Sequence, residues 1–137
     1  MILAGVMSLM AGAAMANEPS RAPSVSPEDV QRWLSQGEAV TLLDVRRPEE
    51  FAKAHVPGAV NISDESQQDK IGALSRQHPI VVYSRQSRYR APAAARMLRA
   101  RGFSNVYVLE GGLAAWQADQ RRAHLVLSAP DAPPSAP

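Results

Sequence analysis

A short basic segment in the middle of the chain carries the residue types best suited to chemistry. Residues 84–90 are polar, hold three arginines, and directly follow the apolar run of residues 79–83. A helix that begins after such a loop directs its first backbone N–H groups and its positive dipole end into the loop. We therefore predict an anion-binding loop composed of Ser84, Arg85, Gln86, Ser87, Arg88, Tyr89 and Arg90.

Other kinds of chemistry have less support in the sequence. The chain has no cysteine, which excludes a disulfide, a thiolate metal site and a lipid attached at a cysteine. A net charge of only +2 does not indicate a nucleic-acid binder. Asp44, Arg46 and Glu50 are charged residues at the end of an apolar run, and we predict that they form an ion network that fixes the first loop. We expect neither a metal nor a cofactor.

The elements that must position these residues alternate between strands and helices. Apolar runs at residues 40–43, 79–83 and 106–109 predict buried strands, because a strand covered on both faces is apolar throughout. Helical patterns lie at residues 26–37, at 90–101 and after Gly112. The alternation predicts an α/β fold with a parallel central sheet and helices on both faces. In such a sheet the working site lies beyond the carboxyl ends of the strands, here at Asp44, Ser84 and Glu110.

The two ends of the chain predict segments outside the domain. Residues 1–16 are uncharged, apolar and end in Ala-Met-Ala, which favours a signal peptide and a periplasmic or secreted protein. A membrane anchor or a buried helix are the alternatives, although the run is shorter than the roughly 20 residues that span a bilayer. We predict a flexible lead-in at 17–25, one domain at 26–120 and a Pro- and Ala-rich disordered tail at 121–137. We expect no stable membrane span in the mature protein.

Four segments in order give the chain a resemblance to the rhodanese family. Residues 42–51 resemble the first signature of that family, and residues 54–62 resemble its continuation, with Ala54 where glycine is usual. Residues 79–83 and the basic loop after them resemble the strand and active-site loop. Residues 102–116 closely resemble the closing signature. The resemblance implies a rhodanese-like fold.

The resemblance also implies roles for the loop. In rhodaneses a cysteine at the start of this loop attacks a sulfur donor such as thiosulfate, holds the sulfur as a persulfide and passes it to an acceptor. The residue aligned with that cysteine is Ser84, and Arg85 matches the family. Gln86 and Ser87 stand where small residues are usual, and Tyr89 stands where a second arginine is common. The nucleophile and its loop have therefore both diverged.

Three functions remain open from the sequence. The first is a catalytically silent module that binds a thiosulfate-, sulfate- or phosphate-like anion, or a protein partner, through the loop. The second is an altered enzyme with Ser84 as nucleophile in acyl or phosphoryl transfer, for which His55 is the only base nearby in sequence. The third is a sulfurtransferase-family protein that takes its cysteine from a partner, or a degenerate relic of one.

Overall fold

The computed structural model describes residues 21–128, and five parallel strands form its centre. The strands are β1 (Ser24–Val25), β2 (Thr41–Asp44), β3 (Val60–Asn61), β4 (Ile80–Tyr83) and β5 (Val106–Leu109). Their spatial order is β1-β5-β4-β2-β3, which places β4 at the middle of the sheet. All four residues of β4 are buried, as expected for a strand that is covered on both faces.

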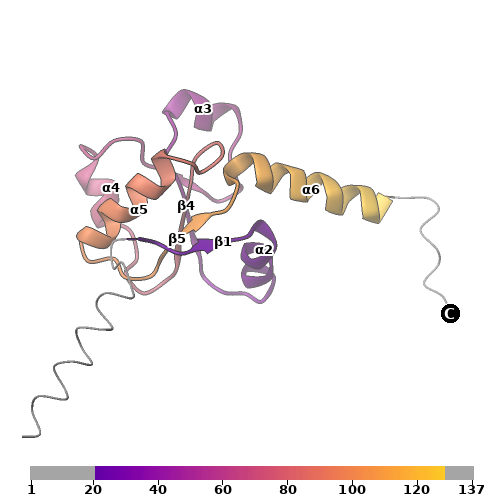
Figure 1. Cartoon of the computed structure of the whole chain (residues 1–137), viewed down its shortest axis with the longest axis horizontal. Coiled ribbons are helices and arrows are strands. Elements are labelled where there is room, and N and C mark those ends of the chain that lie inside the picture. The colour runs from indigo at the N-terminus through magenta and orange to yellow at the C-terminus, as the bar shows by residue number, and fades with distance from the viewer. Residues whose placement is uncertain (1–20, 129–137) are drawn as a thin grey trace, which may run out of the picture.

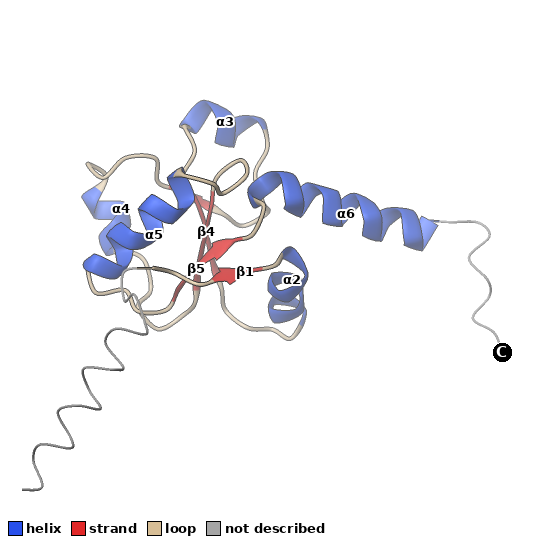
Figure 2. Ribbon diagram, viewed as in Figure 1, coloured by secondary structure: helices blue, strands red, loops and turns tan. Residues whose placement is uncertain are grey.

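Within residues 21–128, four helices connect the strands, a fifth follows the last strand, and together they cover both faces of the sheet (Figures 1 and 2). They are α2 (Pro27–Ser35), α3 (Pro48–Lys53), α4 (Gln68–Gly72), α5 (Arg90–Ala100) and α6 (Gly112–Ser128). One core contains Ile71 of α4 and Leu98 of α5, and the other contains Val30 of α2 and Trp116 of α6. Adjacent strand residues alternate between these two cores, since successive side chains of a strand point to opposite faces. The predicted α/β fold is confirmed.

The ordered domain begins earlier in the chain than the sequence predicted. Residues 17–25 were expected to form a flexible lead-in, but Ser24–Val25 form strand β1. The Pro23 carbonyl accepts the Val108 N–H at 2.9 Å, and the Val25 carbonyl accepts the Glu110 N–H at 2.8 Å. Two residues are too few to display a strand pattern in the sequence, so this strand is recognised only by its pairing with β5. The predicted signal peptide at 1–16 lies outside the described residues.

The last helix also extends further than the sequence predicted. The tail was expected from residue 121, but α6 continues to Ser128 and projects away from the sheet (Figure 1). No proline interrupts the helix before Pro130, and residues 121–127 include good helix formers. The side chains of residues 121–126 are exposed, so this part of the helix covers no core. No helix among residues 21–128 is both long and apolar enough to cross a membrane.

Candidate functional site

The predicted binding loop lies between β4 and α5, at the carboxyl edge of the sheet. Ser84 directly follows β4 and is buried, with 4% of its surface exposed. An open pocket of about 250 Å³ lies beside it. Six of the seven predicted loop residues line this pocket, namely Ser84, Arg85, Gln86, Arg88, Tyr89 and Arg90. The loop therefore borders an open space next to the first residue after the central strand.

The seventh loop residue, Ser87, does not line this pocket but shapes the loop. Its φ is 56°, a left-handed conformation that residues other than glycine seldom adopt. Its hydroxyl accepts the backbone N–H of Ser84 at 3.4 Å, which closes the turn on itself. Strained backbone of this kind is frequent at binding sites, where surrounding contacts hold it in place.

The beginning of α6 holds the loop from the other side. The N–H groups of Leu113 and Ala114 donate to the carbonyls of Ser84 and Arg85, each at 3.0 Å. Gly112 has φ 63°, and a Cβ there would lie 2.4 Å from the Ser84 carbonyl oxygen. Only glycine permits so close an approach. The sequence places two glycines at positions 111 and 112, before a predicted helix, but gives no sign that Gly112 contacts the binding loop.

The loop carries positive charge that nearby carboxylates do not fully neutralise. Arg90 pairs with Glu50 at 3.3 Å. Arg85 and Arg88 are exposed, and within residues 21–128 neither lies within ion-pair distance of a carboxylate. Helix α5 begins at Arg90 without a side-chain cap on its first N–H groups. Those N–H groups and the helix dipole favour an anion in the pocket.

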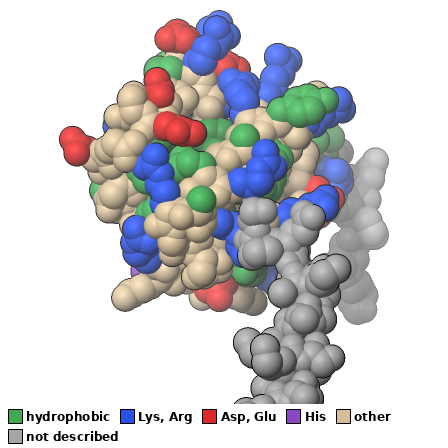
Figure 3. Space-filling model, turned by 60° about the vertical axis from the view of Figure 1, so that its left-hand side comes forward, with side chains coloured by type: hydrophobic (Ala, Val, Ile, Leu, Met, Phe, Trp, Pro, Cys, Tyr) green, Lys and Arg blue, Asp and Glu red, His purple; other side chains and the backbone are tan. Residues whose placement is uncertain are grey.

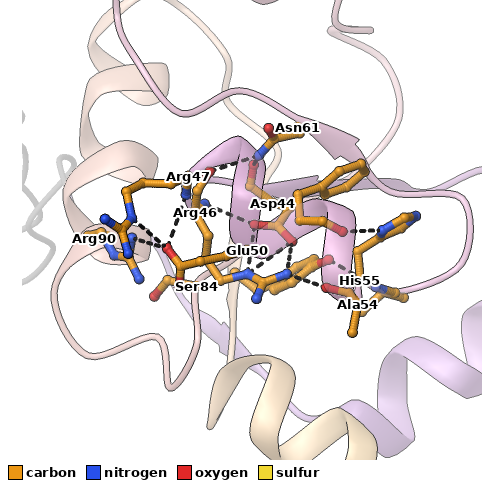
Figure 4. Close-up of polar contacts among 12 residues, drawn as sticks. Asp44, Arg46, Arg47, Glu50, Ala54, His55, Asn61, Ser84 and Arg90 are labelled. Carbon is orange, nitrogen blue, oxygen red and sulfur yellow. Dashed lines mark hydrogen bonds and ion pairs between the residues drawn. The ribbon is translucent and has the colours of Figure 1, made fainter.

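Glu50 ties the loop to α3 rather than to the predicted ion network. Its carboxylate accepts hydrogen bonds from Arg90 and Arg47, which belong to α5 and to the start of α3 (Figure 4). The Arg90 hydrogen bond is the main cause that lowers the pKa of Glu50 to about 2. The carboxylate is therefore ionised at neutral pH and fixes Arg90 at the rim of the pocket.

The other two members of the predicted network, Asp44 and Arg46, form a buried ion pair (Figure 4). Arg46 donates to both Asp44 oxygens, at 2.7 Å to Oδ2 and 3.0 Å to Oδ1, and also to the Ala54 carbonyl. Burial opposes the charge of Arg46, but the hydrogen bonds and charge of Asp44 raise its pKa overall. This pair fixes the segment between β2 and α3, the helix that carries Glu50.

Two further residues that the sequence analysis did not single out for this role complete the support. The Tyr83 hydroxyl accepts the Val56 N–H at 3.0 Å, and burial raises the pKa of this phenol, with Asp44 adding to the shift. Asn61 donates to the carbonyls of both Asp44 and Arg46 at 2.9 Å. Asn61 belongs to β3, and its two partners lie 17 and 15 positions earlier in the chain. Sequence spacing alone therefore could not reveal this contact.

His55 is not placed to act as a base on Ser84. Its ring stacks on Phe51 with centroids 3.8 Å apart, and Nδ1 lies 2.7 Å from the Phe51 carbonyl oxygen. Figure 4 shows His55 and Ser84 at opposite ends of the network. Within the described part of the chain, no hydrogen bond activates the Ser84 hydroxyl. Residues 21–128 also hold no cluster of His, Asp and Glu side chains able to ligate a metal.

Comparisons with known proteins place this geometry in context. The family model of the rhodanese-like domain matches residues 26–119. The thiosulfate sulfurtransferase GlpE of Pseudomonas aeruginosa is 34% identical over 93 residues, which cover 68% of this chain and 82% of that protein. The putative sulfur carrier protein YrkF of Bacillus subtilis is 31% identical over 97 residues, 71% of this chain and 52% of that protein.

Solved structures give the same result for the fold. The rhodanese-like domain of an Anabaena protein superimposes with a TM-score of 0.64 at 32% identity, covering 71% of this chain and 74% of that one. A rhodanese-related protein from Thermoplasma volcanium gives a TM-score of 0.58 at 25% identity, covering 71% of this chain and 92% of that one.

Proposed function

Because the chain belongs to the rhodanese-like domain family, we propose that it is a module without sulfurtransferase activity that binds an anion or a protein partner through the 84–90 loop. Ser84 takes the position of the family nucleophile in this proposal. The observation that carries it is that none of the 137 residues is a cysteine, although the loop, its pocket and the contacts that hold the loop are present.

The chemistry of sulfur transfer explains why serine does not replace cysteine. The family reaction needs a nucleophile that is substantially ionised near neutral pH, which a thiol with a pKa of about 8.5 becomes in a positive environment. A serine hydroxyl is far less acidic and needs an adjacent general base. His55 is held against Phe51 and supplies none. An oxygen–sulfur bond would also be a poor sulfur carrier.

The positive loop supports the binding part of the proposal. Arg85 and Arg88 line the pocket together with Arg90, the first residue of α5, whose first N–H groups have no side-chain cap. Guanidinium groups form charge-assisted hydrogen bonds with sulfate-like oxygens. The ligand class that fits is a small oxyanion of the thiosulfate, sulfate or phosphate kind, or an anionic side chain of a protein partner.

A combined activity and binding experiment tests this proposal on the full chain. We expect no thiosulfate:cyanide activity above background, and we expect sulfate to shift the NMR amide signals of residues 84–90. Arg85→Gln/Arg88→Gln should weaken sulfate binding about tenfold or more, since each lost charged hydrogen bond is worth roughly 1 kcal/mol. Arg121→Gln/Arg122→Gln removes the same charge from the projecting end of α6 and should leave binding unchanged. Wild-type turnover, or sulfate shifts outside the loop only, would contradict the proposal.

We also propose that the protein is exported. The uncharged apolar run that ends in Ala14-Met15-Ala16 supports this, because small residues at these positions precede signal-peptidase cleavage. Mass spectrometry of the natively expressed protein should find a mature N-terminus at or near Asn17 in an extracytoplasmic fraction. Cytoplasmic protein that retains Met1 would contradict this prediction.

A further inference from the structure

A second basic cavity lies next to the binding loop and to strand β1, at the edge of the sheet. It measures about 440 Å³ and we call it the β1 groove. Its walls come from the chain before β1, from β1 itself, from the 84–90 loop and from α5, and Val108 of β5 also lines it. The residues that line it are Arg21, Ala22, Ser24, Ser87, Arg88, Pro92, Arg96 and Val108.

The charge of the β1 groove is unbalanced within the described chain. Arg21, Arg88 and Arg96 are exposed, and none of them lies within ion-pair distance of a carboxylate among residues 21–128. They come from three separate segments, so the fold brings their like charges to one cavity. Figure 3 shows Lys and Arg side chains spread over the face that it displays, with Asp and Glu side chains between some of them. A ligand of the opposite charge would relieve the repulsion between the three guanidinium groups.

The edge of the sheet supplies a second feature of the groove. Strand β1 lies at the edge of the sheet, where the Pro23 carbonyl accepts the N–H of Val108 in β5 and the Val25 carbonyl accepts the N–H of Glu110 just after it. Backbone groups of successive strand residues point to opposite sides, so the N–H and C=O of Ser24 face away from β5. An extended peptide beside β1 can hydrogen-bond to these groups, as peptides do when they add to a sheet edge.

From these two features we infer that the β1 groove binds an acidic, extended peptide segment of a partner protein. Small-molecule sites enclose their ligand and are mostly apolar, whereas this groove is lined by three arginines and two serines, one of which is Ser24 of the edge strand β1. Arg88 lines both the groove and the pocket beside Ser84, so a segment in the groove can place one acidic side chain at the binding loop. The inference rests on the proposed function, and it specifies the partner of that function as a protein with an acidic, extended segment.

An NMR titration of the full chain with a hexaglutamate peptide tests the inference, with hexaglutamine and inorganic phosphate as comparison probes. Hexaglutamate should shift the amide signals of Ser24, Ser87 and Arg96, and hexaglutamine should not. Arg21→Gln/Arg96→Gln should weaken hexaglutamate binding about tenfold, because two exposed ion pairs are lost. Arg121→Gln/Arg122→Gln removes two charges elsewhere and should change the affinity little.

The remaining outcomes separate this inference from the proposed function. Peptide shifts that are confined to residues 84–90 and survive Arg21→Gln/Arg96→Gln would overturn the groove as a site while the proposed loop function stands. If inorganic phosphate shifts the signals of Ser24 and Arg96 equally, the groove is a small-anion site, and the proposal that it binds a peptide is overturned. Equal weakening by the α6 control would mean non-specific charge attraction and also overturn it. If neither sulfate nor peptide shifts any signal, both proposals fail.

Discussion

Ser84→Cys is expected to form a persulfide with thiosulfate and to show thiosulfate:cyanide activity, whereas the wild-type protein is expected to show neither. The introduced thiolate would attack the outer sulfur of thiosulfate, the S–S bond would break, and sulfite would leave with the electron pair. Cyanide would then remove the sulfur as thiocyanate and restore the thiolate. Mass spectrometry detects the added sulfur atom, and the cyanide assay measures turnover.

The geometry of the loop gives the reason for this gain. Position 84 directly follows the central strand and lines the same pocket as the uncapped start of α5, and we expect that helix end to lower the pKa of a thiol there. Arg85 and Arg88 line the same pocket and favour an anionic donor. We expect the activity to be partial, because Gln86, Ser87 and Tyr89 differ from the residues usual in the family. A displacement of about 1 Å in such a site can cost ~100-fold in rate.

Two controls make this prediction specific. Ser104→Cys places the same thiol at an exposed position after α5, outside the pocket, and should give no turnover. The NMR spectrum of Ser84→Cys should keep the signals of β4 and α5, because the change replaces one small buried side chain by another. A folded Ser84→Cys protein that forms no persulfide would show that the anion-binding geometry is lost, and the binding proposal would then fail as well.

The sequence predicted the central elements because their patterns are local. The β-branched run that forms β4 and the apolar run that forms β5 indicate buried strands by themselves. Ala91, Ala95 and Leu98 recur at helical spacing and are buried in α5. The position of the binding loop follows from these elements, since a loop after a central parallel strand must lie at the carboxyl edge of the sheet.

The contacts that support the loop could not be predicted, because they join distant parts of the chain. Glu50 was placed with Asp44 and Arg46, its neighbours in sequence, yet it bonds to Arg90, 40 positions away. The approach of Gly112 to the Ser84 carbonyl exists only because β4 and β5 are adjacent in the sheet. The order of the strands is thus the information that a local pattern lacks, and it determines which residues hold the site.

The buried Asp44–Arg46 pair leads to the largest expected effect on stability. Asp44→Ala would leave the Arg46 guanidinium, whose side chain is 6% exposed, with the Ala54 carbonyl but no counter-charge. Removal of one partner from a buried pair costs about 3–5 kcal/mol. In a domain of this size such a loss should lower Tm by more than roughly 10 °C. Thermal unfolding followed by circular dichroism measures the change.

The exposed pair Asp29–Arg32 is a matched control, because its 2.8 Å separation nearly equals the 2.7 Å of the buried pair. Asp29→Ala should cost about 1 kcal/mol or less, since water already screens both charges. Asp44→Ala/Arg46→Met should be less destabilised than Asp44→Ala alone, because the second change removes the unpaired buried charge and keeps apolar volume. If Asp44→Ala fails to fold, recovery by the double variant gives the same test. Equal losses of stability for Asp44→Ala and Asp29→Ala would mean that burial does not determine how much the Asp44–Arg46 pair contributes to the free energy of unfolding. The support that it gives to the loop through Glu50 would then need another cause.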